Sequence, residues 1–102
     1  MLNKIKRMCG IADVVTIYDD EIKIYMDDCL DDMRASGVPD SIIKAQNPGV
    51  ITAAVLYTKA YLGNDRAYTD KYLNLYRKKV SRLALEEEEN VDKKHSIPDE
   101  WQ

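Results

Sequence analysis

The chain has 102 residues, of which 45% are hydrophobic and 32% are charged, and its formal net charge is -3. This length is enough for one domain with a modest core and too short for a second domain, and the composition is that of a soluble globular protein. The negative balance argues against a surface that binds nucleic acid on all sides, although a local basic stripe is compatible with it.

The first element in chain order is a short helix, because apolar residues recur at helical intervals between Leu2 and Cys9, and Gly10 ends it. Within residues 11–18, the residues Val14, Val15 and Ile17 are compatible with a short strand, but no second convincing strand exists to pair with it. We therefore predict that residues 11–18 form a packed loop. The basic residues near the start are not followed by an apolar run long enough for a signal or membrane segment, so we expect no membrane partner.

A second helix is predicted to begin at Asp19-Asp20-Glu21, because three acids in a first turn complement the positive end of the helix dipole. It ends at Gly37, since Pro39 cannot continue a helix. Residues 40–46 are predicted to add at most one short helical turn. The second helix carries one apolar stripe, which consists of Ile22, Tyr25, Met26, Cys29, Leu30 and Met33.

Residues 48–63 are predicted to form the central helix, because only three of residues 50–62 are polar. A helix without a wide hydrophilic face has to be surrounded by other elements. Asn47 is the predicted N-cap, Pro48 takes the first helical position, and Gly63 takes the left-handed position after the last turn. The helix carries no histidine, cysteine or carboxylate, so we expect a core role without a cofactor.

A last helix is predicted to begin near Tyr68 or Thr69 and to bury the stripe Tyr72, Leu73, Tyr76, Val80 and Leu83. From Glu86, four glutamates in a row oppose the helix dipole and repel one another, so we expect fraying. The predicted fold is therefore all-α, a small bundle of three to four helices around residues 48–63. We expect residues 1–85 to form this domain and residues 86–102 to form a mobile charged tail.

Cys9 and Cys29 lack metal-ligand spacing, so we expect two free thiols that pack as small apolar residues in a reducing compartment. His95 is the only histidine, and no nucleophile or carboxylate is arranged near it in sequence. No glycine-rich phosphate loop, nucleophile elbow or histidine-rich ligand set appears. We therefore predict a protein that is not an enzyme, with no catalytic, metal-binding or cofactor-binding residues and no cofactor.

An acidic stripe is predicted on the solvent side of the second helix, and it consists of Asp27, Asp28, Asp31 and Asp32. Its like-charge pairs one turn apart each cost about 0.2–0.5 kcal/mol in an isolated helix. One hypothesis is magnesium binding, but no second aspartate pair is present on a facing helix. We therefore favour a solvated or partner-facing stripe over a metal site.

A basic stripe is predicted on the last helix, where Lys71, Lys78 and Arg82 share a face and Arg77 and Lys79 flank it. Three interpretations stay open, namely solvated side chains, contacts with phosphate, and pairing with the acidic stripe of a neighbouring copy. Pairing would join identical subunits head to tail, as a closed ring requires. The candidate subunit-interface residues are accordingly Asp27, Asp28, Asp31, Asp32, Lys71, Arg77, Lys78 and Arg82.

The polar tail ends in three residues that are unusual to leave in water, Ile97, Pro98 and Trp101. An aromatic residue near the end of a chain gains most by entering a pocket of a partner. We interpret these three residues as an anchor that orders only against another protein.

Five runs of the chain carry a family resemblance, namely residues 5–11, 18–22, 35–39, 53–65 and 72–85. The most specific run is Tyr57-Thr58-Lys59-Ala60-Tyr61-Leu62-Gly63-Asn64-Asp65, together with the tyrosine-rich helix after it. The order of these five runs, which covers about residues 4–85, resembles that of the small head-tail connector proteins of long-tailed bacteriophages. These are also called adaptor, head-completion or DNA-packaging proteins. The charged tail after Leu85 has no matching family motif.

This resemblance implies a structural virion protein of a phage or prophage, made in the bacterial host cytoplasm and located in the neck of the virion. It implies an all-helical subunit that forms a ring, commonly of twelve copies, beneath the portal. The implied partners are further copies of the chain, the portal protein, and the next head-completion or tail protein. DNA would pass through the channel without sequence-specific binding, and the tail anchor would act on the portal or on a neighbouring subunit.

A second class of function stays open, a small helical DNA-binding or regulatory module whose basic helix contacts the phosphate backbone through Lys71, Arg77, Lys78, Lys79 and Arg82. Two features argue against it. The link before the last helix is not the glycine-containing turn of a helix-turn-helix, and the chain is acidic overall.

Overall fold

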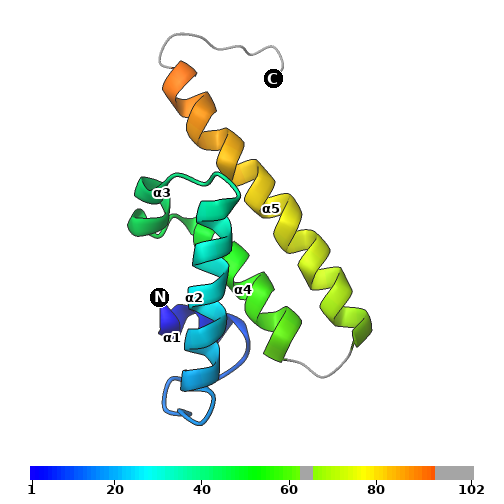
Figure 1. The fold of residues 1–102 in the computed structure, drawn as a ribbon. Coiled ribbons are helices and arrows are strands. Elements are labelled where there is room, and N and C mark those ends of the chain that lie inside the picture. Colours follow the sequence, from blue (N-terminus) through cyan, green and yellow to red (C-terminus); the bar gives the residue numbers. More distant parts are fainter. Residues whose placement is uncertain (63–65, 94–102) are drawn as a thin grey trace.

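The computed structural model describes residues 1–62 and 66–93, and the side chains of residues 1–62 and 67–85. The helices are α1 (Leu2–Met8), α2 (Asp19–Ala35), α3 (Asp40–Ala45), α4 (Pro48–Leu62) and α5 (Arg66–Lys93). No strand occurs within these described ranges, and the predicted all-α fold class is confirmed. Figure 1 shows α2 and α5 on two sides of α4, with α5 extending well past the other helices.

The helix α4 lies at the centre of the bundle and contacts α1, α2 and α5 (Figure 1). It begins at Pro48, as predicted, and the carbonyl of Asn47 accepts hydrogen bonds from the N–H groups of Val50 and Ile51. Its buried residues are Val50, Ile51, Ala53, Ala54, Val55, Thr58 and Ala60. The small alanines allow the neighbouring helices to approach closely, so the least polar helix is also the most enclosed one.

The helices α1 and α2 end at glycines in the left-handed region, Gly10 with φ 81° and Gly37 with φ 100°. Other residues adopt this conformation only with strain. After α2, the N–H of Val38 donates to the carbonyl of Met33 at 2.9 Å, which closes the last turn. The predicted stop signals of both helices are therefore confirmed.

The predicted apolar stripes face the core. The helix α2 buries Ile22, Cys29 and Met33, and α5 buries Tyr76, Val80 and Leu83. Tyr72 and Leu73 are only half-buried. The segment 38–43 adds Val38, Ile42 and Ile43 to the same core cluster. Because Ile42 and Ile43 are both buried, α3 is held as a six-residue helix, slightly longer than the single turn that the sequence indicates.

The loop at residues 11–18 contradicts the expectation that it is packed. Val14 is 87% exposed and Ile17 is 79% exposed, and in this loop Ile11 is the residue that packs against the core.

The last helix also differs from its predicted bounds. It begins at Arg66, before Tyr68, and continues through the glutamate run to Lys93, past residue 85. Arginine, alanine and glutamate all have high helix propensity, which explains the extension at both ends. Gly63, His95, Ile97, Pro98 and Trp101 lie outside the described residues, so the predictions for the left-handed cap and the tail anchor stay predictions.

Candidate interaction surfaces

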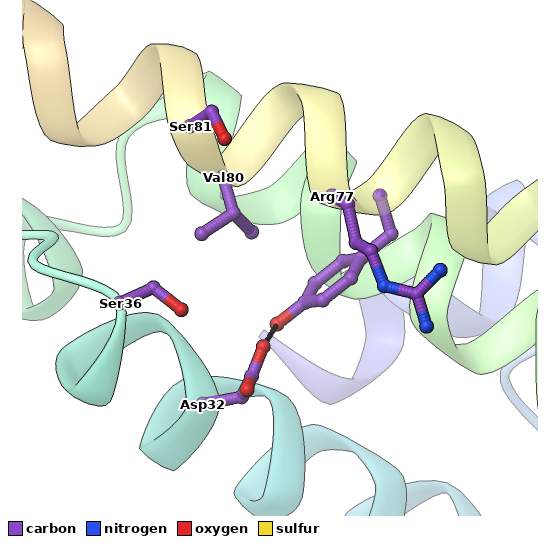
Figure 2. Close-up of a pocket in the computed structure, with 6 residues that line it drawn as sticks. Asp32, Ser36, Arg77, Val80 and Ser81 are labelled. Carbon is purple, nitrogen blue, oxygen red and sulfur yellow. Dashed lines mark hydrogen bonds between the residues drawn. The ribbon is translucent and has the colours of Figure 1, made fainter.

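The acidic stripe of α2 divides into two parts in the structure. Asp32 lies at the seam between α2 and α5, where the hydroxyl of Tyr76 donates to its Oδ2 atom at 2.8 Å (Figure 2). The same hydroxyl also lies 3.2 Å from the carbonyl oxygen of Cys29, and Tyr76 is only 2% exposed. Asp32 therefore holds two helices of one chain together.

Beside this contact, α2 and α5 enclose a pocket of about 230 Å³. It is lined by Asp32, Ser36, Tyr76, Arg77, Val80 and Ser81 (Figure 2). Arg77 thus lies on the side of α5 that faces α2, and its guanidinium donates to Asn74 at 3.4 Å. This position separates Arg77 from the other cations of the predicted basic stripe.

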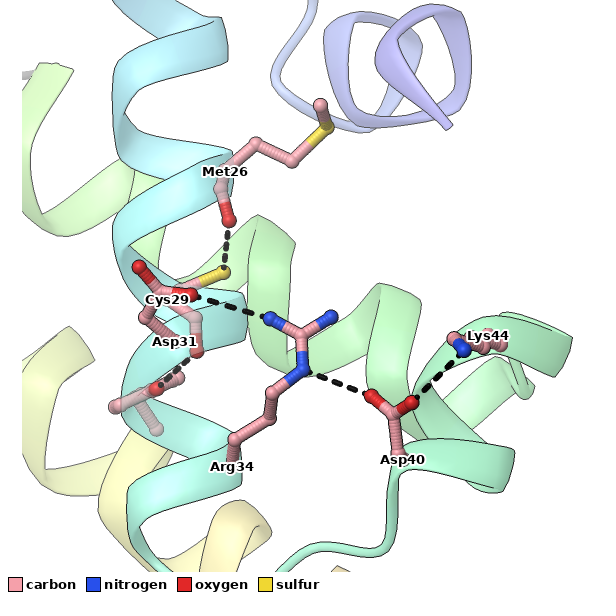
Figure 3. Close-up of polar contacts among 7 residues, drawn as sticks. Met26, Cys29, Asp31, Arg34, Asp40 and Lys44 are labelled. Carbon is pink, nitrogen blue, oxygen red and sulfur yellow. Dashed lines mark hydrogen bonds and ion pairs between the residues drawn. The ribbon is translucent and has the colours of Figure 1, made fainter.

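Asp31 belongs to an ion-pair chain that joins α2 to α3 (Figure 3). Arg34 lies 3.1 Å from Asp31 and donates through Nε to Asp40 at 2.8 Å, and Lys44 lies 3.0 Å from the other oxygen of Asp40. The hydrogen bond from Arg34, followed by that from Lys44, lowers the pKa of Asp40 below its usual value. These groups are exposed, so each pair contributes little to stability.

The other cations of α5 lie on a different face from Arg77. Leu56 and Leu75, together with Lys78, Lys79 and Arg82, line an open groove of about 310 Å³ between α4 and α5. Lys71 is one turn before Leu75 on α5 and is exposed. The structure therefore places an apolar groove with a basic rim between α4 and α5.

Tyrosine rings link the three long helices, a feature that sequence reasoning missed. The ring centres of Tyr25 and Tyr61 are 5.7 Å apart, those of Tyr61 and Tyr57 are 4.9 Å apart, and those of Tyr57 and Tyr76 are 5.0 Å apart. The four-residue interval between Tyr57 and Tyr61 was the available signal, since it places both rings on one face of α4.

The environments of these tyrosines favour the protonated hydroxyl. Burial raises the pKa of Tyr57 to about 12, and a hydrogen bond to Glu21 raises the pKa of Tyr25 to about 12. Burial, and then the hydrogen bond to Asp32, also raises the pKa of Tyr76 above its usual value. Burial also raises the pKa of the Cys29 thiol to about 12.

Stability is therefore expected to fall at alkaline pH. A group whose folded-state pKa is raised contributes stability below its unfolded pKa, and this contribution is lost as the pH rises toward the folded pKa. For the thiol the loss begins near pH 9 and for the tyrosines near pH 10, with a slope of up to about 1.4 kcal/mol per pH unit for each group. Urea titrations between pH 8 and pH 11 measure this slope. Tyr76→Phe should make it shallower, and an unchanged free energy of unfolding across the range would contradict the assignment.

A buried ammonium group is the second feature that the sequence did not indicate. Lys6 is 1% exposed, and its Nζ atom lies 3.0 Å from the carbonyl oxygen of Asp13 and 2.9 Å from Oδ1 of Asp19. The pair joins α1 to the first turn of α2. Lys6 therefore has a structural role at the base of the bundle.

The remaining predicted candidates concern metals, membranes and thiols. Among the residues that the structure describes, no group of three histidine, cysteine or acidic side chains could hold a metal ion. No helix in the same ranges is long and apolar enough to span a bilayer. Cys9 and Cys29 are free thiols, and the Cys29 thiol donates to the carbonyl oxygen of Met26 at 3.2 Å (Figure 3).

Comparison with known proteins identifies a family that the chain matches. A family model described as phage connector protein matches residues 1–90, most of the chain. No curated protein and no solved structure shows significant similarity.

Proposed function

This chain belongs to the phage connector protein family, and on this premise we propose that it is a structural protein of the phage head-tail neck. Copies of the chain form a ring beneath the portal, commonly of twelve, that extends the DNA channel and binds the next head-completion or tail protein. The protein is made in the host cytoplasm, is incorporated into the virion, and works without a cofactor or a reaction of its own. The observation that carries this proposal is the family match over residues 1–90.

The charge distribution supports such an assembly. Asp27 and Asp28 are exposed on α2, and Lys78 and Arg82 are exposed on α5. Because the two helices lie on different sides of α4 (Figure 1), one copy can present its acids to the cations of the next. Contacts between two different surfaces can close into a ring. The net charge of -3 suits a channel through which DNA slides without adhering.

The cations in and beside the groove also favour a second candidate, a DNA-binding module that contacts phosphates through Lys71, Lys78, Lys79 and Arg82. Binding of this kind weakens steeply as the salt concentration rises. Salt-sensitive binding to free duplex, combined with no binding to the portal, would favour this candidate over the connector.

The connector function is tested with purified portal protein from the same phage. We expect electron microscopy to show a ring of this chain on the portal.

Deleting residues 90–102 removes Ile97, Pro98 and Trp101. If these residues form an anchor, the deletion should weaken portal binding by at least about 30-fold, because such anchors contribute about 2 kcal/mol or more. The control variant Asp99→Asn keeps the three apolar residues and should bind as the wild type does. Unchanged affinity of the truncated chain would exclude the anchor, and a portal that never acquires a ring would exclude the function.

A further inference from the structure

Helices α2 and α5 each carry an exposed apolar residue surrounded by charges of a single sign. On α2 this residue is Ile24, which is 59% exposed, and on α5 it is Leu75, which is 41% exposed. We define the acidic patch as Ile24 with Asp20, Asp27, Asp28 and Asp31, and the basic patch as Leu75 with Lys71, Lys78, Lys79 and Arg82. In both patches the charged residues have the same spacing from the central apolar residue. One helix face therefore carries the reverse charge pattern of the other.

The charges of both patches have almost no partners among the side chains that the structure describes. Within the described residues, no ion pair involves the four cations, and none involves Asp20, Asp27 or Asp28. Asp31 pairs only with Arg34, and the side chain of Asp31 is 81% exposed. Like charges three and four residues apart repel one another, at about 0.2–0.5 kcal/mol for each pair. An opposite patch would relieve this repulsion on both helices at once and would cover two exposed apolar side chains.

The basic patch also contains a groove with room for an apolar side chain. Leu75 shares its groove of about 310 Å³ with Leu56 and with three of the cations. Ile24 lies on the exposed face of α2, opposite the buried stripe that contains Ile22 and Cys29. An isoleucine with an acidic rim therefore fits an apolar groove with a basic rim.

The two patches of one chain do not pair with each other. The helix α4 packs against both α2 and α5, and within the described residues no ion pair joins an acid of one patch to a cation of the other. The partner of each patch must therefore come from another molecule. A nucleic acid could approach the basic patch but would be repelled by the acidic one, so a second copy of this chain is the partner that matches both.

We propose that copies of this chain associate head to tail, with the acidic patch of one copy on the basic patch of the next and Ile24 seated in the groove beside Leu75. This inference rests on the proposed function for its biological setting, since it supplies the subunit contact of the ring. It adds Asp20, Ile24, Leu75 and Lys79 to the candidate interface. Asp32 and Arg77 leave that interface, because they occupy the seam between α2 and α5.

The test reverses the charge of one patch at a time and measures association by sedimentation velocity, up to about 1 mM protein at low salt. One variant carries Asp27→Lys and Asp28→Lys, and the other carries Lys78→Glu and Arg82→Glu. Each variant alone should associate at least about 10-fold more weakly than the wild type. An equimolar mixture of the two should regain association, because each reversed patch then meets a complementary one. The control reversals Lys4→Glu and Asp70→Lys lie outside both patches and should leave association unchanged.

Two further variants test the apolar centre without changing charge. Ile24→Ser and Leu75→Ser should each weaken association by about 10-fold, whereas a purely electrostatic attraction would be unaffected by them. Far-ultraviolet circular dichroism confirms that every variant folds, which is expected because all the altered side chains are at least partly exposed.

Three outcomes would overturn the proposed contact, namely a wild-type chain that stays monomeric, variants that associate as the wild type does, or a mixture that fails to regain association. A ring on the portal that none of these variants disturbs would reject this contact and leave the connector function intact. Association through the two patches without any portal binding would reject the connector function and leave the contact intact.

Discussion

Replacing Tyr76 with alanine is expected to lower the free energy of unfolding by about 3–5 kcal/mol, the range for removing a large buried ring. Tyr76 is 2% exposed, and its ring packs against Tyr57 at 5.0 Å between centres. Its hydroxyl also bonds α5 to Asp32 of α2. The substitution therefore removes a contact shared by all three long helices. Urea denaturation followed by circular dichroism measures the change.

Two variants separate the ring of Tyr76 from its hydroxyl. Tyr76→Phe keeps the ring and should cost only about 0.5–1.5 kcal/mol, the net contribution of a hydrogen bond. Tyr68→Ala removes a 56% exposed ring from the same helix and should change stability by no more than about 0.5 kcal/mol. If Tyr76→Ala proved as mild as Tyr68→Ala, the packing of α5 on α4 and α2 would be wrong.

Asp19→Ala is expected to destabilise the protein by about 3 kcal/mol. Removing one member of a buried ion pair leaves the other charge buried, which costs about 3–5 kcal/mol, and the 23% exposure of Asp19 places this case at the low end. The ammonium group of Lys6 would keep only the carbonyl oxygen of Asp13 as a partner. The same urea experiment measures this loss.

The reverse substitution should be much milder. Lys6→Met keeps the side-chain length and leaves a carboxylate that is 23% exposed but whose Oδ1 atom is buried, so we expect a cost of about 1 kcal/mol, the low end for a buried acceptor left unpaired. The double variant Lys6→Met with Asp19→Ala should be more stable than Asp19→Ala alone. As a matched control, Asp20→Ala removes an exposed acid from the same first turn and should cost only about 0.3–1 kcal/mol. Equal effects of Asp19→Ala and Asp20→Ala would show that Lys6 is not buried in solution.

These substitutions and those of the two patches address different properties of the molecule. Tyr76 and Lys6 are buried, so their variants should lower stability, while Ile24 and Leu75 are exposed, so theirs should mainly weaken association. Stability and association can therefore be measured separately on one set of purified proteins.

Several features of the fold follow from local sequence alone. The spacing of apolar residues determines which face of α2 and α5 is buried, as Cys29 and Val80 show. Gly10 and Gly37 end helices because the left-handed conformation at these positions is a property of the glycine backbone itself. The low polarity of residues 50–62 is sufficient to identify α4 as the enclosed helix.

The roles of the charged residues were decided only by the tertiary structure. Asp28 and Asp32 are one turn apart on the same helix, yet Asp32 bonds to Tyr76 across the seam, while Asp28 stays exposed and forms no ion pair within the described residues. Lys6 is buried because Asp19, distant in sequence, reaches its ammonium group. Spacing along a helix determines the direction in which a side chain points, but which element lies in that direction depends on how distant segments pack.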